Sequence, residues 1–432
     1  MTESKTIRLF PSGMVTPPPS KSLSHRALIC AALAAWTAPR HQNSTIESLG
    51  ISQDVAATLN ALAVMGTEFI PTDNGIIAVA GRTAALPEID CAESGSTLRF
   101  LIPIAALGNT AYRFTGRGRL LQRPLDAYLR LFCQGGEHLG VQLALAENSL
   151  TVCGPMRAGR LPLSGDVSSQ FVSGLLLALP LLAEDSEIIL QTPLESRAYV
   201  DLTLEVMQQF GARAEPTPAG YRIAGGQRYR PTDYHVEADY SQAAFFLAAA
   251  ALGCPVACAG LNPESKQGDR AMLDILRGMG AQVAWRDNLT RISARELRAT
   301  TIDAREIPDL VPVLAALLCF AGGESRIVNA QRLRYKESDR LHAICTELQK
   351  LGGNVRQTPD GLLIHGQAAL HGGATVDAHG DHRIAMALAV SAIRCRNPVT
   401  LTGYQSVAKS YPNFWQDFEK EALTWRQAGD TN

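Results

Sequence analysis

The densest group of chemically useful side chains lies between Arg332 and Arg340, where the chain reads R-L-R-Y-K-E-S-D-R. Lys336 and Arg340 are four residues apart and Glu337 and Arg340 are three apart, so a helix would place each pair on one face. Such cations bind phosphate and carboxylate groups, and a carboxylate among them can move a proton. A charge run is more often a solvated helix face, but this one follows an apolar stretch at Ile327-Val328 and so resembles the other helix starts of the chain.

Polar clusters precede apolar, helix-forming runs elsewhere too. They read S-K-S-L-S-H-R from Ser20, S-G-S-T-L-R from Ser94 and G-D-V-S-S-Q from Gly165. The first turn of a helix has unpaired N–H groups and partial positive charge, which favour anions. A glycine such as Gly95 lets backbone N–H groups approach an anion closely. Ordinary helix caps would use the same residue types, so both interpretations stay open for these residues alone.

Three further clusters complete the set. Asp309 stands after Ile307-Pro308 at the mouth of an otherwise apolar helix, where it could be a cap or a base. The others are Asp381-His382-Arg383 and Val407-Ala408-Lys409-Ser410, whereas Asp239-Tyr240-Ser241 is interpreted as a structural cap.

The clusters recur at nearly constant spacing. Their positions are Ser22, Gly95, Ser168, Ser241, Asp309 and His382, with successive intervals of 73, 73, 73, 68 and 73 residues. A second repeat, L-x-x-x-G-x-x-V-x-x-x-x-x-G-x-x-I, has five whole copies. A sixth copy would combine extended residues at Ile7-Arg8-Leu9 with a helix from Phe414 to Leu423. The chain is therefore interpreted as six copies of one unit.

Each copy predicts a βαβαββ unit: a strand, a helix from the polar cluster, a strand, an amphipathic helix and a hairpin. One unit cannot bury its apolar faces, but three stacked units can, with helices inside and sheets outside. We therefore expect an α/β (α+β) fold of two lobes with three units each. The proline run at 16–19 and the polar stretch at 229–236 are the expected crossings. They divide the chain into one lobe of residues 20–235 and a second of residues 1–19 with 236–432.

Composition narrows the class of protein. Apolar residues make up 46% and charged residues 19%, as in soluble globular enzymes, and a net charge of −1 argues against a general nucleic-acid binder. Apolar runs reach about ten residues, short of the roughly 20 that cross a bilayer. With no recognisable signal peptide, we expect a cytoplasmic protein. The nine cysteines lie mostly in apolar segments and predict buried thiols, without disulfides or a zinc site.

Nucleotide-binding motifs give no support for a nucleotide-dependent enzyme. Gly403–Ser410 reads G-x-x-x-x-A-K-S, which lacks the second glycine of a P-loop and is not followed by a long helix. No G-x-G-x-x-G follows an expected strand. Neither an NTP site nor a dinucleotide site is predicted.

The motifs together resemble those of the 5-enolpyruvylshikimate-3-phosphate synthase family. The strings are P-P-S-K-S-x-S-H-R, S-G-S-T-x-R, Q-R-P, G-D-V-S-S-Q, I-P-D, R-x-K-E-S-D-R-L, D-H-R-x-A-M-A and A-K-S-Y-P, and they span the whole chain in order. The resemblance implies the two-lobed enolpyruvyl transferase fold. It also implies a transferase of the shikimate pathway, which leads to chorismate and the aromatic amino acids, active as a monomer on small molecules without a metal or organic cofactor.

The implied reaction transfers the enolpyruvyl group of phosphoenolpyruvate to the 5-hydroxyl of shikimate 3-phosphate and releases phosphate. The implied shikimate 3-phosphate contacts are Lys21, Ser22, Arg26, Ser168, Ser169, Gln170, Ser196, Tyr199, Asp309 and Lys336. The implied phosphoenolpyruvate contacts are Lys21, Gly95, Arg123, Gln170, Arg340, Arg383 and Lys409. Asp309 is the expected base for the hydroxyl, and Glu337 and Lys21 are both candidates for proton transfer to and from carbon.

Some positions depart from the family pattern. Glu93-Ser94 stands where many relatives have Asn-Ala, Phe100 replaces a common proline, and Arg332 replaces an asparagine that contacts substrate in some members. Gly95 is retained where the herbicide glyphosate packs in this family, so we expect sensitivity to it.

Two other functions are compatible with parts of this sequence. The family that acts on UDP-N-acetylglucosamine shares the fold, but it places a reactive cysteine in a loop that here, at 116–122, has none. A non-catalytic phosphate-binding protein would be expected to have lost Asp309, Glu337 or Lys21, and all three are present.

Overall fold

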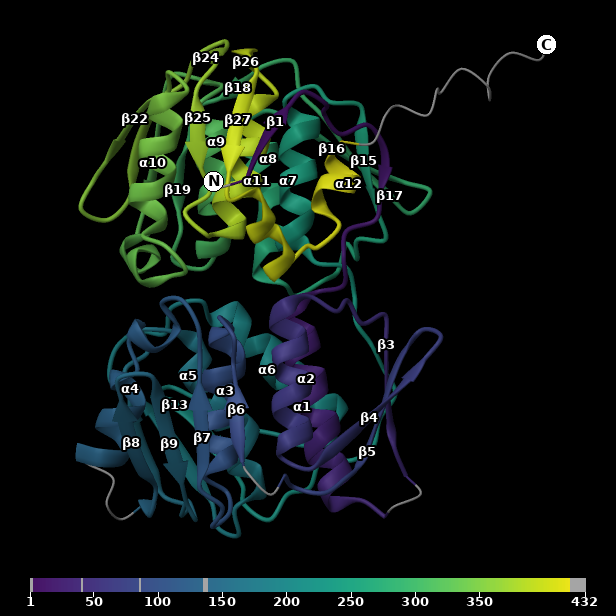
Figure 1. The fold of residues 1–432 in the computed structure, drawn as a ribbon, viewed down its shortest axis with the longest axis vertical. Coiled ribbons are helices and arrows are strands. Elements are labelled where there is room, and N and C mark those ends of the chain that lie inside the picture. Colours follow the sequence, from purple (N-terminus) through teal and green to yellow (C-terminus); the bar gives the residue numbers. More distant parts are fainter. Residues whose placement is uncertain (1–2, 40–41, 85–86, 135–138, 420–432) are drawn as a thin grey trace, which may run out of the picture. The chain divides into compact units, whose positions relative to one another are not determined.

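The protein is described by a computed structural model covering residues 3–39, 42–84, 87–134 and 139–419. It divides into two compact units. The central unit is Pro19–Glu237, and the terminal unit combines Met1–Pro18 with Ala238–Asn432. The chain therefore passes between units twice, once in each direction (Figure 1).

The central unit repeats one βαβαββ pattern. Its elements are α1 (Lys21–Thr37), β3 (Ser44–Glu47), α2 (Gln53–Val64), β4 (Thr67–Thr72) and β5 (Gly75–Ala80); β6 (Glu88–Asp90), α3 (Gly95–Ala105), β7 (Tyr112–Thr115), α4 (Asp126–Leu129), β8 (Gln142–Ala146) and β9 (Ser149–Cys153); and β10 (Arg160–Leu163), α5 (Ser169–Ala178), β11 (Ser186–Leu190), α6 (Arg197–Gln209), β12 (Glu215–Thr217), β13 (Gly220–Ile223) and β14 (Tyr234–His235).

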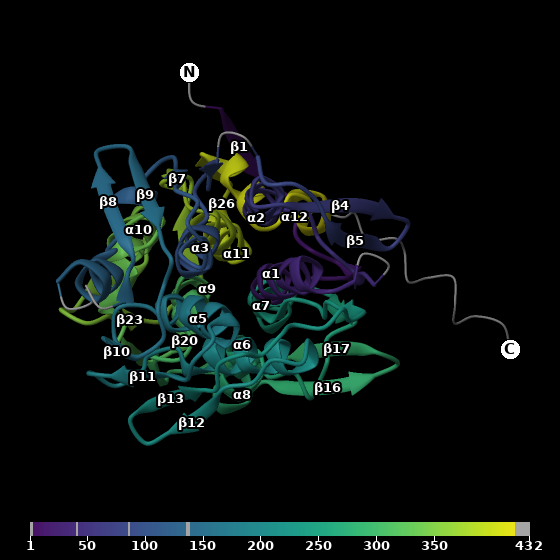
Figure 2. The same ribbon diagram turned by 90° about the horizontal axis from the view of Figure 1, so that it is seen from below.

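The described strands of this unit pair in one recurring order. The sheets run β14-β3-β5-β4, β6-β7-β9-β8 and β10-β11-β13-β12. In each sheet the first two strands are parallel and the remaining pairs are antiparallel. The hairpins β4–β5, β8–β9 and β12–β13 lie outside helices α1, α3, α5 and α6 (Figure 2).

The terminal unit is built in the same way from residues at both ends of the sequence. Its elements are β1 (Ser4–Ile7) and β2 (Gly13–Val15); α7 (Tyr240–Ala251), β15 (Val256–Ala259), α8 (Ala271–Gly278), β16 (Gln282–Arg286) and β17 (Leu289–Ser293); β18 (Leu297–Arg298), β19 (Thr301–Asp303), α9 (Val311–Leu318), β20 (Ala321–Gly322), β21 (Glu324–Val328), α10 (Arg340–Lys350), β22 (Asn354–Gln357) and β23 (Leu362–His365); and β24 (Leu370–Gly372), β25 (Thr375–Asp377), α11 (His382–Ala392), β26 (Cys395–Asn397), β27 (Val399–Thr402) and α12 (Phe414–Phe418).

The two N-terminal strands complete two sheets of this unit. The sheets run β16-β17-β15-β2, β19-β21-β23-β22 and β1-β27-β25, with two further pairs β18-β20 and β24-β26. β1 lies antiparallel to β27, and β2 lies parallel to β15. The predicted sixth copy is thus assembled from the chain ends, but β1 stops at Ile7, and the helix α12 ends at Phe418. The rest of the expected helix, residues 420–423, lies outside the described residues.

Each unit has its own apolar core, built on helices that are buried nearly all round. In α7, Phe245 and Phe246 are fully buried, and in α1 the run Ala27–Ala34 is fully buried as well. Helices that are apolar on every side must lie inside, with sheets covering them. The predicted fold class, with helices inside and sheets outside, is confirmed.

The helix starts are set by local capping. Ser20, Ser94, Ser168, Asp239 and Asp381 each accept a hydrogen bond from a backbone N–H in the first turn of the helix that follows. A cap satisfies N–H groups that have no partner within the helix. Among the described helices, none is both long and apolar enough to cross a membrane.

Candidate active site

In the central unit, the start of α1 presents Lys21 and Ser22. Lys21 Nζ lies 2.7 Å from Asp54 Oδ2 on α2, a half-buried ion pair. Arg26, one turn further, is only 2% exposed. Its N–H groups donate to the Ser22 and Tyr199 carbonyl oxygens and to Thr203 Oγ1, each at 2.7 Å. Arg26 therefore ties the first turn of α1, which carries Ser22, to the first turn of α6, which carries Tyr199.

Burial lowers the pKa of Arg26 to about 10, so the guanidinium stays charged at neutral pH. The guanidinium carbon of Arg26, Cζ, lies 5.0 Å from the centre of the Phe100 ring. Phe100 thus gives the buried cation an aromatic face, which attracts positive charge.

Gly95, the first residue of α3, lies against a group of polar side chains. A Cβ there would be 3.2 Å from Arg123 Nη1 and 3.5 Å from both Arg99 Nη1 and Gln170 Oε1. Arg99 Nη1 donates to Gln170 Oε1 at 2.7 Å, and Gln170 Nε2 donates to Ser96 Oγ at 2.9 Å. Three of the predicted contacts, Gly95, Arg123 and Gln170, are therefore neighbours.

Buried hydroxyl groups connect the starts of α1 and α3. His25 Nδ1 lies 2.7 Å from Thr58 Oγ1, which lies 2.6 Å from Thr97 Oγ1. Thr97 Oγ1 donates to Ser94 Oγ at 2.7 Å. Burial, with the nearby positive charges of Lys21 and Arg26, keeps the pKa of His25 well below its usual value, so the ring is neutral. Ser94 thus has a structural role in this chain of bonds.

The remaining predicted contacts of this unit lie at two other helix starts. Ser168 caps α5 by accepting from the Gln170 N–H at 3.3 Å, and Ser169 is the first residue of that helix. Ser196 precedes α6 with a left-handed backbone (φ 55°) and is 3% exposed. Tyr199 is half-buried in the first turn of α6.

In the terminal unit, Arg340 binds three carboxylates. Its side chain is 2% exposed and lies 2.9 Å from Asp309 Oδ1, 2.7 Å from Glu337 Oε2 and 2.7 Å from Asp381 Oδ2. Burial alone would lower its pKa, but the three carboxylates raise it above the usual value. Arg340 is thus permanently charged and fixes the carboxylates around it.

Asp309 is surrounded by cations. Besides Arg340, its carboxylate lies 3.4 Å from Arg383 Nη2 and 3.6 Å from Lys336 Nζ. Burial raises the pKa of Asp309, but the positive charges of Arg383, Lys336 and Arg340 outweigh it and hold the pKa well below the usual value. Burial and the neighbouring arginines lower the pKa of Lys336, although Asp309 opposes this shift. The protein alone therefore keeps Asp309 ionised.

The segment 332–340 is not the single helix that the spacing predicted. A 3₁₀ helix ends at Tyr335, a turn follows, and α10 begins only at Arg340 because Asp339 caps it through the His342 N–H at 3.0 Å. The expected alignment on a helix is wrong, yet the turn still brings Lys336 and Glu337 to the same group as Arg340. Arg332 donates to the Arg305 carbonyl oxygen.

Arg383 and Lys409 each donate a hydrogen bond to a main-chain carbonyl oxygen, and Arg383 also donates to a hydroxyl. Arg383 Nη2 donates to Ser241 Oγ at 2.9 Å, and its Nη1 donates to the Asp309 carbonyl oxygen at 3.2 Å. Lys409 Nζ donates to the Gly380 carbonyl oxygen at 2.8 Å. Asp239 accepts a hydrogen bond from Ser241 Oγ at 2.6 Å and so orients the hydroxyl that holds Arg383.

Sequence reasoning missed several of these supporting residues. Asp54, Asp381 and Ser241 each hold a predicted site cation, but none was selected for that role. Asp381 stands in the quoted D-H-R string, which was a usable signal. Ser241 lies in a cluster interpreted only as a cap, and its bond to Arg383 spans 142 residues of sequence.

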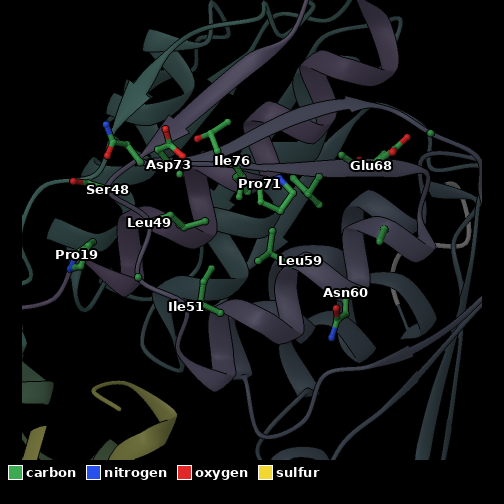
Figure 3. A pocket seen from close by; sticks show the side chains of 18 of the residues that line it. Pro19, Ser48, Leu49, Ile51, Leu59, Asn60, Glu68, Pro71, Asp73 and Ile76 are labelled. Carbon is green, nitrogen blue, oxygen red and sulfur yellow. The ribbon is translucent and has the colours of Figure 1, made fainter. Parts of the chain in front are cut away.

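A cavity in the central unit lies apart from these predicted residues. Its volume is about 940 Å³, and it lies between α2 and the β4–β5 hairpin (Figure 3). Leu49, Ile51, Leu59 and Pro71 line it, together with the carboxylates Glu68 and Asp73. Arg82 lines it as well, and none of the predicted site residues does.

Within the described part of the chain, no group of three or more His, Cys, Asp or Glu side chains could hold a metal ion. The nine cysteines are free, and Cys30, Cys319 and Cys345 are buried as expected, whereas Cys133 is exposed.

Comparisons with known proteins agree with one another. Residues 10–418 match the family EPSP synthase (3-phosphoshikimate 1-carboxyvinyltransferase). The chain is 42% identical to the 3-phosphoshikimate 1-carboxyvinyltransferase of Clostridium novyi over 433 residues, covering 96% of this chain and 97% of that one. It is 41% identical to the enzyme of the same name from Clostridioides difficile, with 96% and 97% covered.

Solved structures agree on the fold. The EPSP synthase of Acinetobacter baumannii matches with a TM-score of 0.77 at 25% identity, covering 96% of this chain and 97% of that one. The enolpyruvyl transferase NikO of Streptomyces tendae matches in fold with a TM-score of 0.75 at 20% identity, covering 96% of each chain. From the family match and the close relatives, the chain belongs to the EPSP synthase family.

Proposed function

We propose that this protein transfers the enolpyruvyl group of phosphoenolpyruvate to the 5-hydroxyl of shikimate 3-phosphate, releasing phosphate. Family membership over nearly the whole chain supports the reaction. The observation that carries the assignment of residues is the group formed by Asp309, Arg340, Arg383 and Lys336, since it combines a carboxylate base with three cations. A monomeric state and a cytoplasmic location stay predictions.

Charge explains why two anionic substrates fit this protein. Each carries a phosphate of about −1.5 to −2 and a carboxylate, so both need several cations. The proposed shikimate 3-phosphate contacts are Lys21, Ser22, Arg26, Ser168, Ser169, Gln170, Ser196, Tyr199, Asp309 and Lys336. The proposed phosphoenolpyruvate contacts are Lys21, Gly95, Arg123, Gln170, Arg340, Arg383 and Lys409. Most of the former lie in the central unit, while the terminal unit supplies Asp309 and four of the cations.

Arg26 contributes mainly by positioning. Three of the five N–H donors of its guanidinium are already given to Ser22, Tyr199 and Thr203. Its proposed effect on the shikimate phosphate is therefore partly indirect, through the Ser22 and Tyr199 backbone that it fixes.

The addition step forms a bond between the 5-oxygen and C2 of phosphoenolpyruvate while C3 gains a proton. Asp309 takes the hydroxyl proton, and Glu337 or Lys21 delivers a proton to C3. Elimination then removes a proton from C3, breaks the bond between C2 and the phosphate oxygen, and restores the double bond. Arginines and lysines stabilise the negative charge on the departing phosphate.

The low pKa of Asp309 fits this role once substrates are considered. A carboxylate with a very low pKa is a weak base, and the cations around Asp309 are the cause. Anionic substrates bound to those cations would offset their charge and raise the pKa of Asp309. The base would thus become effective only when the substrates are in place.

The test measures phosphate release from phosphoenolpyruvate by the purified protein with either shikimate 3-phosphate or UDP-N-acetylglucosamine. We expect release only with shikimate 3-phosphate. Release only with UDP-N-acetylglucosamine would assign the other acceptor. Release with neither would favour a binding protein that has lost the activity.

A further inference from the structure

The turn between β25 and α11 has an unusual backbone. His379 has a φ of 51° and Gly380 a φ of 62°, so two consecutive residues are left-handed. Glycine adopts this region freely, but a residue with a Cβ is disfavoured there. His379 therefore needs a stabilising interaction to hold this conformation.

A buried carboxylate supplies that interaction. Glu347 on α10 is fully buried, and its Oε1 lies 2.8 Å from His379 Nε2. Its Oε2 accepts from the Asp377 backbone N–H at 3.0 Å, and Lys350 Nζ lies 2.8 Å from the same oxygen. Glu347 thus binds the turn at two points, Asp377 and His379. The turn also closes on itself, because the His379 N–H donates to Asp377 Oδ1 at 2.7 Å.

The pKa values of His379 and Glu347 are both shifted towards the charged forms. The hydrogen bond to Glu347 raises the pKa of His379, aided by the charge of Asp377 and opposed by burial and by Lys350. Burial alone would raise the pKa of Glu347, but hydrogen bonds from His379, Lys350 and the Asp377 N–H hold it below the usual value. The bond between His379 and Glu347 is therefore an ion pair below the raised pKa of His379, and above that pKa a neutral imidazole donates it.

The same turn carries two supports of the proposed phosphoenolpyruvate contacts. The Gly380 carbonyl oxygen accepts from Lys409 Nζ at 2.8 Å. Asp381 follows directly and binds Arg340 Nε at 2.7 Å and the Arg383 backbone N–H at 2.9 Å. A shift of the turn would move Lys409, Arg340 and the first turn of α11 together.

We propose that His379 and Glu347 are positioning residues for the phosphoenolpyruvate contacts of this enzyme. Neither side chain is assigned a contact with a substrate. Glu347 fixes the turn, and the turn sets where Lys409 and Arg340 present their donors. This inference rests on the proposed function, since it concerns how tightly phosphoenolpyruvate is held during that reaction.

Two variants of His379 separate the hydrogen bond from the charge. His379→Ala removes the side-chain bond to Glu347, so the left-handed backbone at this position keeps the bond of its N–H to Asp377 but loses that anchor. His379→Gln places an amide nitrogen near the position of Nε2, so it keeps a donor for Glu347 but cannot titrate. The control is His365→Ala, because His365 forms an exposed pair with Glu324 at 3.5 Å in the same unit.

We expect His379→Ala to raise the KM for phosphoenolpyruvate about tenfold, with a much smaller change in the KM for shikimate 3-phosphate. His379→Gln should restore most of the loss at pH 8, and His365→Ala should behave like the unaltered protein. A loss of folding alone would lower the active fraction and leave both KM values unchanged.

A pH series adds an independent readout. Because the folded pKa of His379 is raised, the charged bond is fully present below the ordinary value of about 6.5 and is lost as pH rises through the raised pKa. The unaltered protein should therefore have a lower KM for phosphoenolpyruvate than His379→Gln at about pH 6, and the two should converge towards pH 8.5. The ratio of the two KM values at each pH is compared, because the titration of the substrate phosphate affects both proteins equally and cancels.

Two results have separate meanings. If the unaltered protein transfers no enolpyruvyl group, the proposed function fails. If it is active but His379→Ala keeps both KM values, or raises them equally, the positioning role is wrong. Isothermal titration calorimetry of each variant with phosphoenolpyruvate measures the binding affinity directly and so checks the positioning role without turnover.

Discussion

The cations of the two units are held in different ways. In the central unit, Arg26 donates to carbonyl and hydroxyl oxygens and Arg99 to an amide oxygen, and Lys21 pairs with the carboxylate of Asp54. In the terminal unit, Arg340 alone binds the carboxylates of Asp309, Glu337 and Asp381. In these bonds the arginines of the central unit thus have neutral acceptors, whereas Arg340 has acidic ones.

This difference fits two chemical tasks. Neutral partners orient a cation without cancelling its charge, which suits the binding of a stable anion. Carboxylates beside cations cancel much of that charge but supply groups that accept protons, which suits catalysis. We therefore expect loss of the carboxylates around Arg340 to affect turnover most, and changes around the neutrally held arginines of the central unit to affect binding.

The largest effect is expected for Asp309→Ala, which removes the proposed base. Turnover should fall by about 10²–10⁴-fold, the usual contribution of general acid–base catalysis. Phosphoenolpyruvate binding should persist, because Arg340, Arg383 and Lys336 lose a competing negative charge. Steady-state rates and titration calorimetry measure the two quantities.

The control for Asp309→Ala is Asp274→Asn, which removes an exposed carboxylate paired with Arg277 on α8. It should leave both turnover and binding unchanged. Normal turnover in Asp309→Ala would remove Asp309 as the base and would break the division of tasks between the units.

A smaller effect, on folding, is expected from two matched substitutions, Arg340→Met and Arg26→Met. The first leaves three carboxylates without their shared cation, and breaking a buried ion pair in this way costs about 3–5 kcal/mol. The second leaves only neutral acceptors, a loss of about 1–3 kcal/mol. One of these acceptors, the Tyr199 carbonyl oxygen, also receives a bond from Thr203 Oγ1 at 3.0 Å.

The free energies of unfolding in urea compare these two variants directly. Arg340→Met should lose clearly more stability than Arg26→Met. Equal losses, or a larger loss for Arg26→Met, would mean that the carboxylates around Arg340 contribute no more than neutral partners do.

The sequence predicted the architecture well because helix caps and repeat spacing are local features. Ser94, Asp381 and the other caps lie within a few residues of the N–H groups that they satisfy. The pairs that hold the site cations are not local. Lys21 and Asp54 are 33 residues apart, and Arg383 and Ser241 are 142 apart, so only the packing of helices brings them together.

The same reason explains the error at 332–340. The spacing of Lys336 and Arg340 suits a helix, but Asp339 caps α10 and starts it too late to include Lys336. Three-dimensional packing of the turn against Asp309 then restores the proximity that the helix was expected to give. Glu347 and His379 carried no sequence signal, because the strain at His379 is a property of the backbone.

The smallest effect is expected for Gly95→Ala, which tests whether the central unit acts mainly through binding. In Gly95→Ala the added Cβ would lie 3.2 Å from Arg123 Nη1, tighter than usual contact, and 3.5 Å from Arg99 Nη1 and Gln170 Oε1. The backbone is helical there, so only the neighbouring side chains must move by a few tenths of an ångström. The KM for phosphoenolpyruvate should rise by about three- to tenfold, with little change in turnover, as for a loss of roughly 1 kcal/mol of binding. If glyphosate packs against Gly95, as the resemblance implies, its inhibition constant should rise more than that KM, because a larger ligand leaves less room for the methyl group.

The matched substitution Gly278→Ala adds a Cβ that meets nothing within 4 Å. It should leave both constants unchanged. A large fall in turnover for Gly95→Ala would instead mean that the residues around Gly95 take a direct part in the chemical step.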